Sequence, residues 1–231
     1  MKKIIFLSLV VLIVFFIYLF NIDKKVYFLA LGDSLTVGTN AFGEDIYGYT
    51  DYVKDYLDDK NKLEKYVNYA VNGYRTIDVI NDINDNKVIT INDEEITLKN
   101  ALIKADVLTI SIGSNDLLYY LSYNDNRKYI VEVINDMDKL FKLIREYCKE
   151  DIFVMGFYNP FYYMTSLNSD VKYANDLLKE LTEKYNMTYI EVSDELNSNK
   201  YLPNMNDIHP SKEGYKIISK KFIKEIEKHV F

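Results

Sequence analysis

The sequence predicts an α/β protein built on a mostly parallel sheet. Short apolar runs alternate along the chain with segments whose apolar residues recur at helical spacing. Strands that alternate with helices call for a parallel sheet with helices on both faces. The 231 residues suffice for one domain with a sizeable core, and no repeat or linker interrupts residues 26–231.

Five apolar runs are predicted to be the strands of this sheet: residues 26–30, 66–71, 107–112, 152–157 and 187–192. Helical spacing predicts the helices over residues 49–57, 76–83, 128–149, 171–185 and 215–229. Residues 87–98 alternate in two short pieces about a polar turn, which predicts a hairpin outside the main sheet.

The charge of the chain argues against a nucleic-acid partner. The formal net charge is −7. Residues 1–25 carry about +3, so the rest of the chain carries about −10. The single cysteine, Cys148, excludes an intrachain disulfide. Because it stands in a helical pattern among apolar residues, we expect a buried thiol rather than a catalytic one.

The N-terminal segment is typical of a membrane anchor. Lys2 and Lys3 precede about 17 nearly uninterrupted apolar residues, 4–20, which is at the short end of a transmembrane helix. The lysines favour a cytoplasmic N-terminus and an extracellular body. Residues 16–20 are all bulky, so no small-residue cleavage site follows. We therefore expect residues 1–25 to be an uncleaved single-pass anchor and linker. With cleavage, the protein would be secreted.

Three predicted strands are each followed by residues suited to catalysis: 32–34, 72–73 and 113–116. In a parallel sheet these loops converge at the carboxyl edge of the strands. Ester hydrolysis needs a nucleophile, a base and donors for the developing oxyanion. Ser34 has the place of a nucleophile, although a serine after Gly-Asp also suits a turn or a helix N-cap.

The base is sought among the only two histidines of the chain, His209 and His229. His229 is predicted to lie at the solvated end of the last helix. His209 precedes Pro210, which holds it in an extended conformation just before that helix. His209 is therefore the candidate base.

Four blocks occur in a fixed order: residues 32–35 (Gly-Asp-Ser-Leu), Gly73, residues 113–116 (Gly-Ser-Asn-Asp) and residues 209–210 (His-Pro). This order resembles that of the SGNH, or GDSL-type, hydrolases. The resemblance spans nearly all of residues 26–231. It implies a flavodoxin-like three-layer α/β/α fold with a five-stranded parallel sheet. It also implies esterase or lipase activity that needs no metal or cofactor.

The resemblance also assigns roles to residues. Ser34 is the expected nucleophile and His209 the expected base. The expected oxyanion donors are the backbone N–H groups of Ser34 and Gly73 and the side-chain amide of Asn115. Asp116 is expected to hold its own loop.

The third member of the triad departs from the family pattern. The family usually places an aspartate three residues before the histidine, where this chain has Asn206. Asp207, two residues before, can both accept a hydrogen bond from the imidazole and stabilise its charge. We expect Asp207 in this role, and otherwise a dyad supported by Asn206 or a backbone carbonyl.

These observations predict a membrane-anchored extracellular serine esterase that works through an acyl-enzyme on Ser34. An acyltransferase would use the same acyl-enzyme, and a non-catalytic binding module could keep the same fold. Envelope esters are natural substrates for a tethered enzyme. The aromatic loop 158–163 is expected either to line an acyl or aryl pocket or to pack as a lid.

Overall fold

The computed structural model describes residues 10–12, 25–91, 93–120 and 126–230. Most of the predicted anchor, including nearly all of residues 4–20, lies outside this part of the chain. In the described ranges no helix is long and apolar enough to cross a bilayer. The predicted transmembrane helix therefore has no support from the fold.

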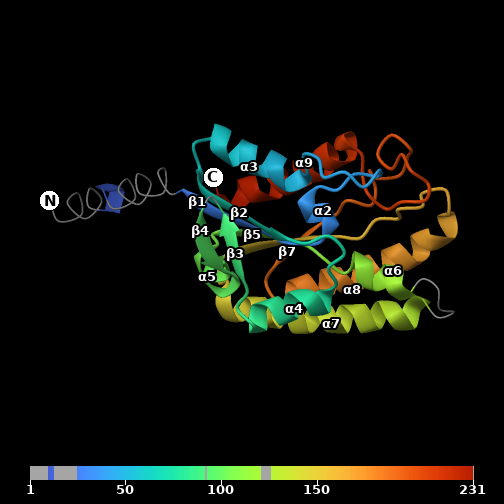
Figure 1. The fold of residues 1–231 in the computed structure, drawn as a ribbon, viewed down its shortest axis with the longest axis horizontal. Helices are drawn as coiled ribbons and strands as arrows, with labels where there is room; N and C mark the ends of the chain where they lie inside the picture. The colour runs from blue at the N-terminus through green and yellow to red at the C-terminus, as the bar shows by residue number, and fades with distance from the viewer. Residues whose placement is uncertain (1–9, 13–24, 92, 121–125, 231) are drawn as a thin grey trace.

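A five-stranded parallel sheet forms the centre of the molecule, as the sequence predicts (Figure 1). Its strands stand in the order β2-β1-β5-β6-β7, and every pairing between neighbours is parallel. The strands are β1 (Val26–Gly32), β2 (Leu63–Ala70), β5 (Val107–Ser111), β6 (Asp151–Met155) and β7 (Thr188–Ile190). The predicted hairpin forms as β3 (Val88–Ile91) and β4 (Glu94–Thr97), an antiparallel pair apart from the main sheet.

Helices cover both faces of the sheet, which gives the three layers (Figure 1). One face carries α3 and α9, and the other carries α4, α7 and α8. The helices are α2 (Ser34–Val37), α3 (Tyr49–Asp59), α4 (Thr76–Asn84), α5 (Leu98–Lys104), α6 (Ser114–Tyr120), α7 (Asn126–Tyr147), α8 (Asn168–Lys184) and α9 (Lys212–Val230), with a 3-10 turn η1 (Thr165–Leu167) before α8.

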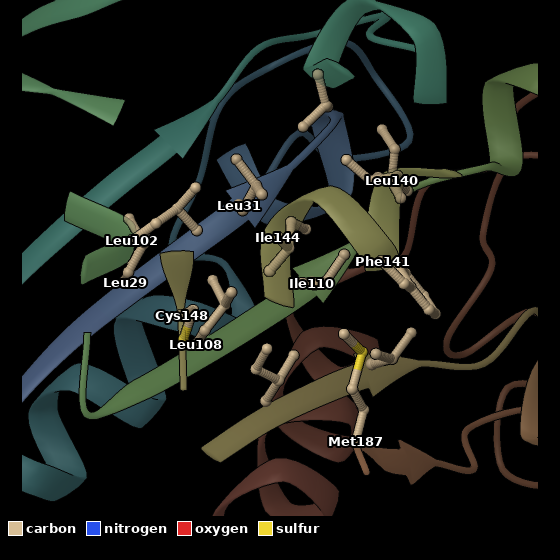
Figure 2. Packing of buried hydrophobic residues seen from close by; sticks show 14 of the residues in the cluster. Leu29, Leu31, Leu102, Leu108, Ile110, Leu140, Phe141, Ile144, Cys148 and Met187 are labelled. Atoms are coloured by element: carbon tan, nitrogen blue, oxygen red, sulfur yellow. The ribbon is translucent and has the colours of Figure 1, made fainter. Parts of the chain in front are cut away.

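The core consists of two layers, one on each side of the sheet. On the α7 side, Leu29 and Leu31 of β1 pack in one cluster with Ile110 of β5 and with Phe141 and Ile144 of α7 (Figure 2). All seven residues of β1 are buried. A strand buried on both faces has to be apolar throughout, which explains the unbroken apolar run at its position in the sequence.

The opposite layer packs β1 against α3 and α9. Phe28 and Ala30 face this side. Tyr49 at the start of α3 stacks on Phe222 of α9, with their ring centroids 4.7 Å apart. Cys148 is fully buried in the first layer, as predicted (Figure 2).

Three short helices are absent from the sequence-based assignment: α2, α5 and α6. Each has only four to seven residues. Such a length covers one or two turns, so an apolar stripe barely repeats within it. Two of them, α2 and α6, follow strands directly and carry the loop residues of the candidate site.

Candidate active site

Ser34 lies at the carboxyl end of β1 as the first residue of α2. Asp33 caps this helix, because its Oδ1 accepts a hydrogen bond of 3.0 Å from the N–H of Leu35. The capping residue is thus Asp33 and not Ser34, which leaves the serine hydroxyl free for other contacts. A Cβ at Gly32 would meet the carbonyl oxygen of Ser111 at 2.2 Å, so only glycine lets the two strands approach here.

His209 reaches Ser34 across 175 positions of sequence. Its Nε2 lies 2.7 Å from Oγ of Ser34, and its Nδ1 lies 2.6 Å from Oδ1 of Asp207. The same Oδ1 accepts the backbone N–H of His209 at 2.8 Å. The loop geometry therefore brings Asp207 to the imidazole, while Asn206 is exposed. Asn206 interacts through its backbone N–H, which donates to the side chain of Asn204.

The second histidine lies at the other edge of the sheet. Nδ1 of His229 is 2.9 Å from Oδ1 of Asp151, the first residue of β6. The amino end of β6 is opposite the carboxyl edge where Ser34 stands. Of the two histidines, His209 is the one that contacts the serine.

A buried tyrosine supports the histidine loop. The hydroxyl of Tyr158 donates a hydrogen bond of 2.6 Å to the carbonyl of Ile208, next to His209. Burial, together with the nearby negative charges of Asp33 and Asp207, raises the pKa of Tyr158 well above its ordinary value. The phenol therefore stays protonated and keeps donating. Tyr158 belongs to the aromatic loop 158–163, but no feature of the sequence indicates that it supports the loop of His209.

The loops after β2 and β5 flank Ser34, because β1 pairs with both strands. Gly73 has φ +80°, the left-handed region that favours glycine. Asn115, in the first turn of α6, donates from Nδ2 to the carbonyl of Tyr74 at 2.9 Å. The predicted donors Gly73 and Asn115 thus belong to two loops that are joined by a hydrogen bond.

Asp116 joins the same two loops rather than holding only its own. Its Oδ2 accepts from the N–H of Thr76 at 3.0 Å and from the Thr76 hydroxyl at 3.1 Å. Thr76 begins α4, so the bond ties the start of α4 to the start of α6. No motif in the sequence marks Thr76 for this role.

Asp33 carries an unusual carboxyl group beside the serine. Its side chain is buried, and Oδ2 has no hydrogen-bond partner among the described residues. Burial, assisted by the charge of Asp116, raises the pKa of Asp33 to about 7, although the hydrogen bond from the N–H of Leu35 acts to lower it. The Gly-Asp-Ser-Leu motif includes Asp33. Its raised pKa follows from its burial, which the sequence alone does not reveal.

An apolar cavity of about 100 Å³ lies next to the site. Residues 158–161 of the aromatic loop line it, as one of the two interpretations of that loop expected. Its other lining residues come from α6, α7, α8 and their neighbouring loops. Within the described ranges, no three His, Cys, Asp or Glu side chains gather as a metal site.

Solved structures of similar fold include esterases and a lipase. A lipase from a goat rumen metagenome has a TM-score of 0.70 at 24% identity, and the match covers 84% of this chain and 94% of the lipase. Axe2, an acetylxylan esterase from Geobacillus stearothermophilus, has a TM-score of 0.67 at 19% identity, and the match covers 89% of this chain and 96% of that enzyme. At these identities the likeness shows the fold.

The sequence itself shows the family. The chain is 28% identical over 217 residues to the uncharacterized protein YpmR of Bacillus subtilis, and the match covers 86% of this chain and 80% of YpmR. Residues 30–217 match the GDSL-like Lipase/Acylhydrolase family, and this range runs from β1 to α9 and includes every block of the site. The chain therefore belongs to the GDSL-like lipase/acylhydrolase family, a family of ester-bond hydrolases.

Proposed function

We propose that the protein hydrolyses carboxylic esters through an acyl-enzyme on Ser34. The observation that carries this proposal is the 2.7 Å contact between Oγ of Ser34 and Nε2 of His209. In the proposed reaction, Oγ attacks the ester carbonyl carbon while Nε2 accepts the hydroxyl proton. The tetrahedral intermediate then collapses, and the alcohol leaves with that proton. Water, activated by the same imidazole, attacks the acyl group and restores Ser34.

Asp207 is proposed as the positioning and charge-stabilising partner of His209. A hydrogen bond from Nδ1–H to the Asp207 carboxylate fixes the tautomer in which Nε2 is the acceptor. The carboxylate also stabilises the imidazolium that forms when Nε2 takes the proton. The 2.6 Å distance to Nδ1 supports this role.

The oxyanion is proposed to be bound by the N–H groups of Ser34 and Gly73 and by the amide of Asn115. Ser34 begins a helix, where N–H groups lack intrahelical acceptors. Neutral donors held in place stabilise a charge that appears only in the transition state. The bond from Asn115 to the carbonyl of Tyr74 occupies part of its NH₂ group, which leaves the other N–H for substrate.

The similar structures include catalytic mutants of Axe2 in which a serine, a histidine or an aspartate is replaced. The same three residue types meet in this chain as Ser34, His209 and Asp207. This agreement supports a triad.

The first test is hydrolysis of p-nitrophenyl acetate by the full chain and by Ser34→Ala. We expect turnover by the wild type and a loss of at least about 1,000-fold in kcat for the variant. Equal rates for the two proteins would contradict the proposal. Circular dichroism of both proteins controls for folding.

We also propose that residues 1–25 tether the catalytic domain, residues 26–231, to the outer side of a membrane. The paired Lys2 and Lys3 and the apolar residues 4–20 support this. In intact cells that express the full chain, added protease should digest the domain, and the chain should sediment with membranes. A domain that is protected until the cells are lysed would contradict the extracellular location. A chain released into the medium would indicate cleavage.

A further inference from the structure

We propose that Asp116 is a positioning residue for the oxyanion donors: through its bonds to Thr76, its carboxylate holds the loops of Gly73 and Asn115 at the spacing that one oxyanion requires. This inference rests on the proposed esterase function and adds a residue that acts on the donors without touching the substrate. Three observations carry it: the separate origin of the two donors, the way in which the turn of Gly73 is fixed, and the burial of the Asp116 carboxylate.

The two donors belong to loops that follow the two neighbours of β1. Gly73 comes after β2, whereas Asn115 lies in the first turn of α6, after β5. The helices that continue these loops, α4 and α6, both pack against α7 and make few contacts with each other. The spacing of the donors therefore depends on direct bonds between the two loops.

The turn that carries Gly73, residues 71–74, is fixed at its start by β1. The N–H of Val71 donates to the carbonyl of Gly32 at 3.2 Å, and the N–H of Tyr74 closes the turn on the carbonyl of Val71 at 3.2 Å. With φ +80°, Gly73 suits the third position of such a turn. Gly73 is exposed, and its N–H has no acceptor among the described residues. This donor is therefore available to a substrate.

The far end of the turn is fixed by α6. The carbonyl of Tyr74 accepts from Nδ2 of Asn115 at 2.9 Å. Two residues later, Thr76 donates its N–H at 3.0 Å and its hydroxyl at 3.1 Å to Oδ2 of Asp116. Thr76 begins α4, and the N-cap residue of that helix, Arg75, provides no side-chain cap. Because the first N–H groups of a helix lack intrahelical acceptors, Asp116 caps α4 from a different helix.

The bond between Asp116 and Thr76 is buried. Thr76 is fully buried, and Asp116 is 8% exposed. Burial raises the pKa of Asp116, while the N–H and hydroxyl of Thr76 and the charge of Arg75 act to lower it. Removing the carboxylate would leave two buried donors of Thr76 without a partner. The turn would then shift to satisfy them.

Such a shift would disturb both donors at once. In the proposed reaction, Asn115 presents one N–H of its amide to the oxyanion while the other binds the carbonyl of Tyr74. A movement of α4 relative to α6 would displace Gly73 and turn the Asn115 amide. Donors stabilise the transition state only at the place where the oxyanion forms, and a displacement of about 1 Å can cost about 100-fold in rate.

The first test compares Asp116→Ala with the wild type in the hydrolysis of p-nitrophenyl acetate by the full chain. We expect kcat to fall by roughly 10- to 100-fold while KM stays within about twofold, because the donors bind the oxyanion more strongly than the ester carbonyl. Asp116→Asn keeps an oxygen that accepts from Thr76 and should restore kcat to within about fivefold of the wild type. An unchanged kcat in Asp116→Ala, or a loss that lies in KM alone, would overturn the inference.

Asp78→Ala is the matched control at the same end of α4. Oδ2 of Asp78 accepts from the N–H of Arg75 at 2.9 Å, so this carboxylate caps the helix from within. Among the described residues it makes no bond to α6. We expect both alanine variants to lower the free energy of unfolding in urea, and only Asp116→Ala to lower kcat. Equal losses of kcat would make Asp116 a helix cap and no more.

A double-mutant cycle separates positioning from a general loss of structure. Asn115→Ala should by itself lower kcat by about 100-fold or more, because it removes one donor. In this background Asp116→Ala should cost less than about fivefold further, since one of the donors that it positions is already gone. Losses that multiply in full would show that Asp116 acts independently of Asn115 and would contradict the inference.

Thr76 gives a second test if Asp116→Ala does not fold. Thr76→Val removes the hydroxyl bond and keeps the N–H bond, so we expect kcat to fall by about three- to tenfold. Thr76→Ser keeps the hydroxyl and should restore the rate. Equal rates for the valine and serine variants would overturn the inference.

Ser34→Ala separates this inference from the proposed function. If the wild type is no faster than Ser34→Ala, the esterase proposal fails and this inference fails with it. If hydrolysis depends on Ser34 but kcat is the same in Asp116→Ala as in the wild type, the esterase proposal stands and only the role of Asp116 is wrong.

Discussion

At the scale of single residues, the chain departs from the pattern of its family by one position and compensates through loop geometry. Asp207 stands two residues before His209, and its Oδ1 accepts both the backbone N–H and the imidazole of that histidine. The hydroxyl of Tyr158 donates to the carbonyl of Ile208, the residue between Asp207 and His209, and so supports this loop. The neighbouring Asn206 is exposed.

This geometry predicts which substitution is costly. Asp207→Ala should lower kcat for p-nitrophenyl acetate by roughly 100- to 10,000-fold, because the imidazole loses its orientation and the countercharge of its protonated form. Asn206→Ala is the matched control one position away and should keep kcat within about twofold of the wild type. If Asn206→Ala lost its activity while Asp207→Ala stayed active, Asn206 and not Asp207 would be the residue that supports His209.

At the scale of elements, the site depends on a helix of four residues, α2, whose cap is the buried Asp33. In the folded chain its pKa is about 7, against an ordinary 3.8. Between pH 3.8 and about pH 7, Asp33 is therefore protonated in the folded state and ionised in the unfolded state. The stability that this proton contributes is complete below about pH 4 and is lost as the pH rises through about 7, by up to about 4 kcal/mol.

Asp33→Asn should remove this dependence, because an amide keeps the oxygen that accepts from Leu35 and cannot ionise. Relative to the wild type, the variant should gain free energy of unfolding between about pH 4 and about pH 8, measured by urea denaturation of the full chain. Asp194→Asn, the same change on an exposed loop residue, is the control. A constant difference between Asp33→Asn and wild type across this pH range would contradict a neutral Asp33.

The elements also show what the sequence can and cannot reveal. The long helices and the buried strands were predicted because their apolar patterns extend over several turns or over a whole strand. The helices α5 and α6 were not, because seven residues each give too little pattern. Ser34, Gly73, Asn115 and His209 were predicted as site residues from the order of the motifs along the chain. The supports Tyr158 and Thr76 were not, because their roles arise from contacts 50 and 40 positions away.

At the scale of the whole molecule, the parallel sheet explains why distant residues meet. β1 is buried on both faces and pairs with both β2 and β5, so the loops that follow these strands flank Ser34. The last loop before α9 then brings His209 to the same edge. The site is thus fixed by the central strands of a rigid core, which suits a reaction that needs donors and base in place beforehand.

Covalent labelling tests most directly whether Ser34 is an activated nucleophile. The full chain would be incubated with a fluorophosphonate, which reacts with activated serines, and analysed by intact-mass and peptide mass spectrometry. We predict one adduct per chain, on the peptide that contains Ser34, and none on Ser34→Ala. An unlabelled wild type, or an adduct elsewhere while Ser34 stays unmodified, would contradict this prediction.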